Sequence, residues 1–172
     1  PCGIILSGGP ATVTLHSNPR APDWVFNHSV PLLGICYGMQ TMAAQLGGEV
    51  QSSDLREFGY AELKLEGHSK LLAGIEDRVS AEGDGLLDVW MSHGDKVTRL
   101  PPDFKVLCAT RNAPIAGMAN EERHWYGLQF HPEVTHTIQG LRILERFVVD
   151  ICQAATDWTS EMIIDETIQH IR

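Results

Sequence analysis

The sequence predicts one α/β domain built on an open, mostly parallel sheet flanked by helices, with a smaller region of antiparallel strands. Two continuous apolar runs, residues 3–6 and 30–35, favour a parallel sheet, because its strands are buried on both faces and do not alternate. The second run passes directly into a helical pattern. Between residues 49 and 106 the pattern changes to short segments that alternate apolar and polar residues, which is typical of antiparallel strands.

Composition limits the classes of function. The chain has 172 residues, of which 43% are hydrophobic, so it can form a packed core. Its formal net charge is −9 and it has no basic run, which argues against binding to a nucleic-acid backbone. No stretch has the length of a membrane span and no signal peptide is visible, so we expect a cytoplasmic protein without membrane contact. The four scattered cysteines fit a reducing compartment and predict neither a disulfide framework nor a metal site: Cys2, Cys36, Cys108 and Cys152.

The first strand ends in a glycine pair, in the sequence Ser-Gly-Gly-Pro at residues 7–10. A glycine pair after a buried strand leaves backbone N–H groups free to face a ligand. The lysine and the following Ser or Thr of a phosphate-binding P-loop are absent. We interpret the stretch as half of an oxyanion hole. A tight turn without a function is the alternative, and this stretch alone does not separate the two.

Residues 34–38 read Gly-Ile-Cys-Tyr-Gly, at the point where the second strand must turn into a helix. This is the spacing of a nucleophile elbow, in which a side chain at either glycine would clash with the crowded backbone. The turn lifts the Sγ atom of Cys36 above the sheet, and the positive end of the next helix favours its thiolate. A buried structural cysteine is the alternative, and the two glycines argue against it. We therefore predict that Cys36 is a nucleophile.

Helices are predicted on both sides of this second strand. Residues 11–20 form a polar connection, and a short helix over residues 21–27 begins near Pro22. The helix after Cys36 runs over residues 37–46 and stops at the glycine pair 47–48. Four apolar residues at helical spacing predict the face that packs on the sheet: Met39, Met42, Ala43 and Leu46.

The middle of the chain carries strands and loops. Residues 60–65 and 86–91 are predicted strands, and the second should end in a polar turn, Ser-His-Gly-Asp at residues 92–95, a plausible place for substrate contacts. Three aspartates lack the spacing of a calcium loop, so we expect them to be solvated: Asp84, Asp88 and Asp95.

Three further strands are predicted over residues 105–110, 115–120 and 125–130, and the last runs into His131-Pro132-Glu133. In an extended segment, residues two apart project to the same side, so His131 and Glu133 should be neighbours. A histidine backed by a carboxylate is the base and orienting pair that a thiol nucleophile needs. Two alternatives are a solvent-facing pair and a metal site that adds His136, for which further ligands at familiar spacing are lacking.

The chain ends in two predicted helices. The first covers residues 139–153, and its apolar stripe is Leu141, Leu144, Phe147, Val148 and Ile151. After a break at residues 154–157, a second helix over residues 158–172 would be capped by Thr159 or Ser160. This second helix lies beyond the expected end of an α/β domain.

The elbow at residues 34–40, the glycine pair at 7–10 and the His-Pro-Glu at 131–133 resemble the ordered motifs of class I glutamine amidotransferases. The resemblance extends to about residue 153. It implies a flavodoxin-like fold and the hydrolysis of glutamine to glutamate and ammonia through a cysteine thioester. It also implies roles for eight residues: Cys36, His131 and Glu133 catalytic, Gly9 and Tyr37 as oxyanion donors, and Gln40, Ser92 and Gly94 around the amino-acid end of glutamine.

Within this family, residues 88–95, 131–137 and 145–152 resemble members whose ammonia is used for ATP-dependent amination of a purine nucleotide. Such a likeness implies a domain over residues 1–153 that lacks the family's opening strand and helix. Residues 154–172 would then be a linker and the first helix of an ATP-pyrophosphatase synthetase domain. ATP and magnesium would bind that domain rather than these residues, which should hold no cofactor. The likeness also implies a homodimer, formed through the part of the protein that would follow residue 172.

Three other functions stay open. The chain could serve a different amidotransferase, or it could be a γ-glutamyl thiol hydrolase on the same fold. A non-catalytic regulatory module is a third reading. The presence of Cys36, His131 and Glu133 together argues against a regulator, which would need none of the three.

Overall fold

A computed structural model of the protein describes residues 1–15 and 17–157. Its helices are α1 (Asp23–Asn27), α2 (Tyr37–Gln45) and α3 (Gly140–Glu145), the last continuing as the π-helix η1 (Arg146–Ile151). Its strands are β1 (Ile4–Leu6), β2 (Leu32–Ile35), β3 (Glu49–Leu65), β4 (Arg78–Val79), β5 (Gly85–Arg99), β6 (Lys105–Ala109), β7 (Gly117–Asn120) and β8 (Trp125–Leu128). The predicted helix over residues 158–172 lies outside the described residues.

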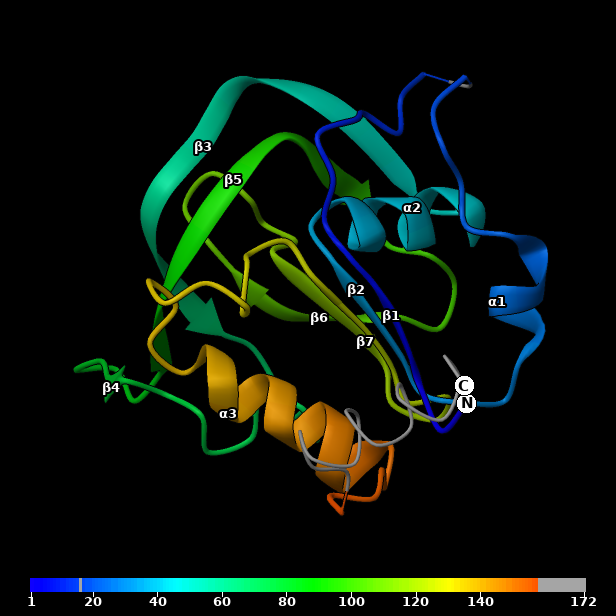
Figure 1. The fold of residues 1–172 in the computed structure, drawn as a ribbon. Coiled ribbons are helices and arrows are strands. Elements are labelled where there is room, and N and C mark those ends of the chain that lie inside the picture. The colour runs from blue at the N-terminus through cyan, green and yellow to red at the C-terminus, as the bar shows by residue number, and fades with distance from the viewer. Residues whose placement is uncertain (16, 158–172) are drawn as a thin grey trace, which may run out of the picture.

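All eight strands belong to one curled sheet, in the order β1-β2-β8-β7-β6-β3-β5-β4 (Figure 1). The predicted α/β class is confirmed. Only the β1–β2 and β2–β8 pairings are parallel, whereas the five other pairings are antiparallel. The antiparallel strands, predicted as a smaller region, thus continue the same sheet and make up the larger part of it.

The strands β3 and β5 form a long antiparallel ribbon that arches over the rest of the molecule (Figure 1). The prediction of a polar turn at residues 92–95 was wrong, because this stretch lies inside β5. Residues 92–95 stay paired with β3 because β3 has an irregularity between Ser52 and Glu57. Beyond this irregularity, Glu57 pairs with His93. An inserted bulge of this kind bends a strand without ending it.

Two of the three predicted solvated aspartates instead form ion pairs, and the third is buried. Asp84 contacts the Nζ atom of Lys64 at 2.7 Å, and Asp88 contacts the guanidinium of Arg78 at 2.6 Å. Asp95 is only 8% exposed, because it lies on the inner side of the β3–β5 ribbon, where it lines a cavity described below.

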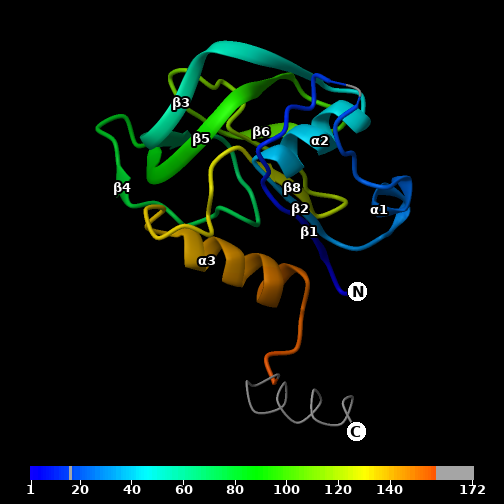
Figure 2. The ribbon, with the colours of Figure 1, turned by 45° about the horizontal axis from the view of Figure 1, so that its top comes forward.

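The core has one apolar cluster on each face of the sheet, as expected for a strand such as β2 that is buried on both sides, whereas β1 was wrongly predicted to be so, because its Ile5 is 44% exposed. Leu32 of β2 packs with Met39 and Met42 of α2, which confirms the predicted packing face of that helix. The next residue, Leu33, belongs to the opposite cluster, together with Phe147. The helices α2 and α3 accordingly lie on opposite sides of the central strands (Figure 2).

The apolar stripe predicted for the last helix is only partly right. Leu141 is 76% exposed and Val148 is 37% exposed, whereas Ile143 and Phe147 are buried. An α-helix turns by about 100° per residue, so Leu141, two residues before Ile143, lies on nearly the opposite side. Leu144 and Ile151 pack against the core at its margin, as predicted.

The turn from β2 into α2 depends on two glycines, as the sequence predicts. A Cβ atom on Gly38 would lie 2.0 Å from the carbonyl oxygen of Leu6 in β1. A Cβ atom on Gly34 would lie 2.7 Å from backbone atoms of Gly38 and Met39. Backbone atoms cannot rotate away as a flexible side chain does, so neither position admits a larger residue without displacement of α2.

Replacing Gly38 with alanine is therefore expected to lower the free energy of unfolding by about 3 kcal/mol or more. Helix propensity has the opposite sign, since alanine in a helix is favoured over glycine by about 1 kcal/mol. Thermal unfolding measures the change. Gly9→Ala is the control, because its Cβ atom would lie 3.8 Å from its nearest neighbour. Equal stability of the two variants would contradict the argument.

No helix in the described part of the chain combines the length and the apolar character that crossing a membrane requires.

Candidate active site

Cys36 is held between the end of β2 and the start of α2. Its backbone N–H donates to the carbonyl oxygen of Leu128 at 2.7 Å, which fixes it beside the end of β8. Its φ of 51° and ψ of −105° place a non-glycine residue in a strained conformation. This is the backbone of a nucleophile elbow, with the first N–H groups of α2 next to the thiol.

His131 follows β8 in a loop that is fastened to β5. Its N–H donates to the carbonyl oxygen of Trp90 at 3.1 Å, and its own carbonyl oxygen accepts from the hydroxyl of Thr137 at 2.6 Å. The Nδ1 atom of His131 lies 2.7 Å from the Oε1 atom of Glu133. The expected pairing of these two side chains is confirmed, although the segment forms a turn rather than an extended strand.

Gly8 lies where the thiol and the imidazole come together. A Cβ atom there would be 3.1 Å from the Cε1 atom of His131 and 3.6 Å from the Cβ atom of Cys36. The facing Cys36 and, to a smaller extent, Glu133 raise the pKa of His131 to about 9, whereas burial opposes this rise. The Nε2 atom of His131 is buried and has no hydrogen-bond partner among the described residues. The thiol and imidazole are thus close but not hydrogen-bonded, which is common before substrate binds.

Both groups open into a cavity of about 750 Å³. Four of the residues predicted around the substrate line it: Gly9, Gln40, Ser92 and Gly94. Tyr37 packs at its rim, with its ring 3.8 Å from where a Cβ atom on Gly9 would be. The structure therefore brings all the predicted site residues except Glu133 to one cavity or its rim, and Glu133 stands behind His131.

Sequence reasoning missed several polar residues of this site. Gln129 is fully buried, and its Nε2 atom donates to the Sγ atom of Cys36 at 3.7 Å. Arg56 lines the same cavity, and so does Asp95, which belongs to the predicted substrate-contact stretch 92–95 but was itself expected to be solvated. Gln129 directly follows β8 and stands two residues before His131, and this closeness in the sequence is the signal that could have identified it. The position of Arg56 depends on the irregularity of β3, and no local sequence pattern predicts that irregularity.

The structure also bears on His136, considered above as a metal ligand, and on the three other cysteines. The ring of His136 stacks on Trp90, with centroids 4.5 Å apart, so its face is occupied by an aromatic contact. Burial raises the pKa of the Cys108 thiol far above its usual range and that of Cys152 to about 11. Such thiols resist ionisation, and Cys2 lies outside the cavity.

Comparison with known proteins gives the same picture. A family model described as glutamine amidotransferase class-I matches residues 1–151. A GMP synthase (glutamine-hydrolyzing) from Legionella pneumophila (strain Philadelphia 1) is 75% identical over the whole chain, which covers 33% of that protein. A GMP synthase (glutamine-hydrolyzing) from Methylococcus capsulatus is 63% identical over the same share of each protein. The chain thus spans about a third of the length of these curated relatives.

Solved structures agree in fold. The crystal structure of a protein from Thermoplasma acidophilum, described as one subunit of GMP synthase, has 28% sequence identity and a TM-score of 0.72, covering 88% of this chain and 73% of that one. A glutamine amidotransferase from Thermotoga maritima has 25% identity and a TM-score of 0.56, covering 74% of this chain and 49% of that one. With a family model that matches nearly all the described residues, the chain belongs to the class I glutamine amidotransferases.

Proposed function

We propose that this chain hydrolyses glutamine to glutamate and ammonia with Cys36 as nucleophile, as the glutaminase part of a GMP synthase. The observation that carries the proposal is the meeting of the Cys36 thiol and the His131 imidazole in one cavity, with Glu133 2.7 Å behind the imidazole. The names of the two GMP synthases described above support the wider role. The ammonia would be used to aminate XMP to GMP, with ATP and magnesium bound by the rest of such an enzyme.

In the first half of the reaction the proton lost by the Cys36 thiol is held on His131, and the Sγ thiolate of Cys36 attacks the side-chain amide carbon of glutamine. The resulting oxyanion would accept hydrogen bonds from the backbone N–H groups of Gly9 and Tyr37. A pKa of about 9 keeps His131 protonated at neutral pH, so it can give its proton to the leaving nitrogen. The C–N bond breaks, ammonia leaves, and a glutamyl thioester remains on Cys36.

In the second half His131 removes a proton from water, and the hydroxide attacks the thioester carbon. The C–S bond breaks, glutamate leaves and its acid proton passes to solvent, and Cys36 is left as a thiolate beside the protonated His131. Glu133 accepts a hydrogen bond from Nδ1 throughout, so Nε2 stays directed at the reacting atoms.

The charges of the cavity support an amino-acid substrate. It is lined by one guanidinium, Arg56, and one carboxylate, Asp95, which suit the carboxylate and the ammonium group of free glutamine. A γ-glutamyl thiol hydrolase acting on a γ-glutamyl peptide would instead need room beyond the scissile amide nitrogen, where the peptide is attached. Gln40, Ser92 and Gly94 line the same cavity as Asp95.

The full-length chain should release glutamate from glutamine, and ATP with XMP should increase the rate if the ammonia is used for GMP. Assays with and without these nucleotides test both parts. Release of glutamate without any effect of XMP would support the glutaminase activity but contradict the role in GMP synthesis. Turnover of γ-glutamyl peptides but not of glutamine would support the hydrolase instead.

The rate of glutamine hydrolysis is expected to fall as the pH rises past about 9, because His131 then loses the proton that departing ammonia needs. Glu133 is one of the groups that raise this pKa, so Glu133→Gln should move the falling limb to lower pH. Rate profiles between pH 6 and pH 10, measured at saturating glutamine, test this. A limb that stays in place, or that moves to higher pH, would show that Glu133 does not support the imidazolium.

A further inference from the structure

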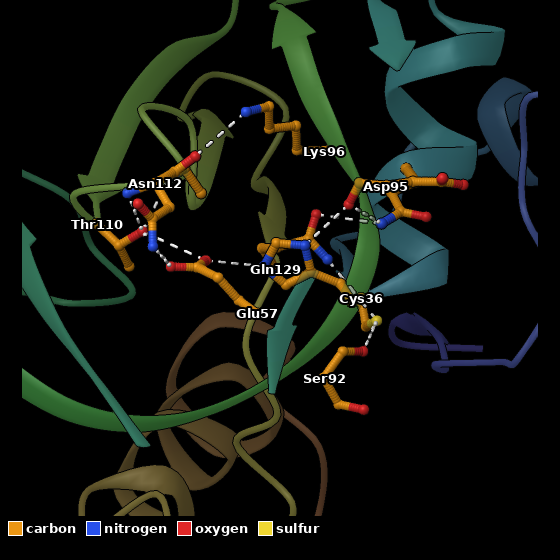
Figure 3. A network of polar contacts seen from close by, with 11 residues as sticks. Cys36, Glu57, Ser92, Asp95, Lys96, Thr110, Asn112 and Gln129 are labelled. Atoms are coloured by element: carbon orange, nitrogen blue, oxygen red, sulfur yellow. Dashed lines mark hydrogen bonds and ion pairs between the residues drawn. The ribbon is translucent and has the colours of Figure 1, made fainter. Parts of the chain in front are cut away.

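A line of buried polar groups connects the nucleophile with the wall of the cavity (Figure 3). The Nε2 atom of Gln129 donates to the Sγ atom of Cys36 at 3.7 Å. The Oε1 atom of Gln129 accepts from the Nε2 atom of Gln40 at 3.2 Å, and the same Nε2 atom donates to the carbonyl oxygen of Asp95 at 2.9 Å. Gln40 and Gln129 are 3% and 0% exposed, so water does not compete for these contacts.

This arrangement fixes the orientation of both side-chain amides. The carbonyl oxygen of Asp95 can only accept, so Gln40 must turn its amino group toward it. That amino group also faces Gln129, which must then present its oxygen. The amino group of Gln129 is therefore directed at Cys36, and a flipped amide would place two donors against each other.

The Asp95 carbonyl, on which the orientation depends, is itself anchored. It also accepts from the Nδ1 atom of His93 at 3.0 Å, and the Nε2 atom of His93 lies 3.1 Å from the carboxylate of Glu57. The same carboxylate accepts hydrogen bonds from the side chains of Thr110 and Asn112, in the loop after β6 (Figure 3). The β3–β5 ribbon is thereby tied to the loop that follows the neighbouring strand β6.

Ionisation of the thiol changes which of its neighbours attract the Sγ atom and which repel it. In the neutral form the thiol donates to the carbonyl oxygen of Ser92 at 3.6 Å. A thiolate has no proton to donate, so the same oxygen then repels it. The amino group of Gln129 is a donor in both forms, and a hydrogen bond to a charged acceptor is stronger than one to a neutral acceptor.

We infer that Gln129 is a further catalytic residue, which stabilises the Cys36 thiolate by direct hydrogen-bond donation and is oriented for this by Gln40. The inference rests on the proposed function for the role of Cys36. It assigns Gln129 to the step that forms and regenerates the thiolate, and not to the binding of the amino-acid end of glutamine.

Gln129→Met and Gln129→Glu in the full-length chain test this assignment. Methionine keeps the length and removes the donor, whereas glutamate keeps an acceptor for Gln40 and places an acceptor against sulfur. Both variants should lower kcat by about 10- to 100-fold, the range for loss of one hydrogen bond to a charged group, with little change in KM. Gln45→Met is the matched control, because Gln45 lies on α2 and its side chain, within the described part of the chain, bonds only to the backbone of Ala21.

Alkylation by iodoacetamide without substrate supplies a readout that a merely structural role would not move. The pH at which Cys36 reaches half its maximal alkylation rate should rise in both Gln129 variants, more in Gln129→Glu, and stay unchanged in Gln45→Met. An unchanged midpoint in both variants would overturn the inference, whatever happens to kcat. If the alkylation midpoint rises in both variants but the unchanged protein does not hydrolyse glutamine, the role of Gln129 is supported and the proposed function is contradicted.

Discussion

Cys36→Ala is expected to lower the rate of glutamine hydrolysis by about 10⁴-fold or more, the largest effect of any single change in this chain. No other group can form the thioester, because the cavity holds no second thiol among the described residues. Release of glutamate by the full-length chain measures the loss. Cys152→Ala is the matched control, since burial raises the pKa of that thiol to about 11 and its activity should be unchanged.

The same variant separates loss of chemistry from loss of folding. If the proposed GMP synthase role is right, Cys36→Ala should still form GMP when ammonia is supplied directly, because ammonia bypasses the thioester. Residual glutaminase activity close to that of the unchanged protein would mean that the nucleophile is another residue. Loss of the ammonia-dependent reaction as well would point to misfolding.

His131→Ala should have the next largest effect. A positioned acid–base group contributes roughly 10²–10⁴-fold, and His131 carries protons in both halves of the reaction. Glu133→Ala should cost less, because it removes the orientation and charge support of the imidazole but leaves the imidazole itself. Steady-state glutaminase assays of the two variants give the ranking. Equal losses, or a larger loss for Glu133→Ala, would show that their roles are misassigned.

Much of the site could be predicted because local backbone chemistry specifies it. The two glycines around Cys36 are required by contacts with backbone atoms of β1 and α2. The elbow can therefore be identified from residues 34–40 alone. His131 and Glu133 are two residues apart and meet for that reason. The parallel strands β1 and β2 are likewise marked by uninterrupted apolar runs.

The antiparallel half of the fold was harder to predict, because long-range pairing decides it. Nothing local to residues 92–95 shows that β5 continues through them, since the partner residues lie in β3 beyond an irregularity. Asp95 is buried for the same reason, although its sequence surroundings are polar. Gln129 was missed because its role requires Gln40, 89 residues away along the chain, to be its neighbour in space.

The central claim is that Cys36 is the nucleophile, and covalent labelling tests it most directly. A chloroketone analogue of glutamine, incubated with the full-length chain, should react with the Sγ atom of Cys36, and glutaminase activity should disappear in proportion to the label. Peptide mapping by mass spectrometry should find Cys2, Cys108 and Cys152 essentially unlabelled, and excess glutamine should slow the reaction. Full loss of activity with the label on any residue other than Cys36 would contradict the account.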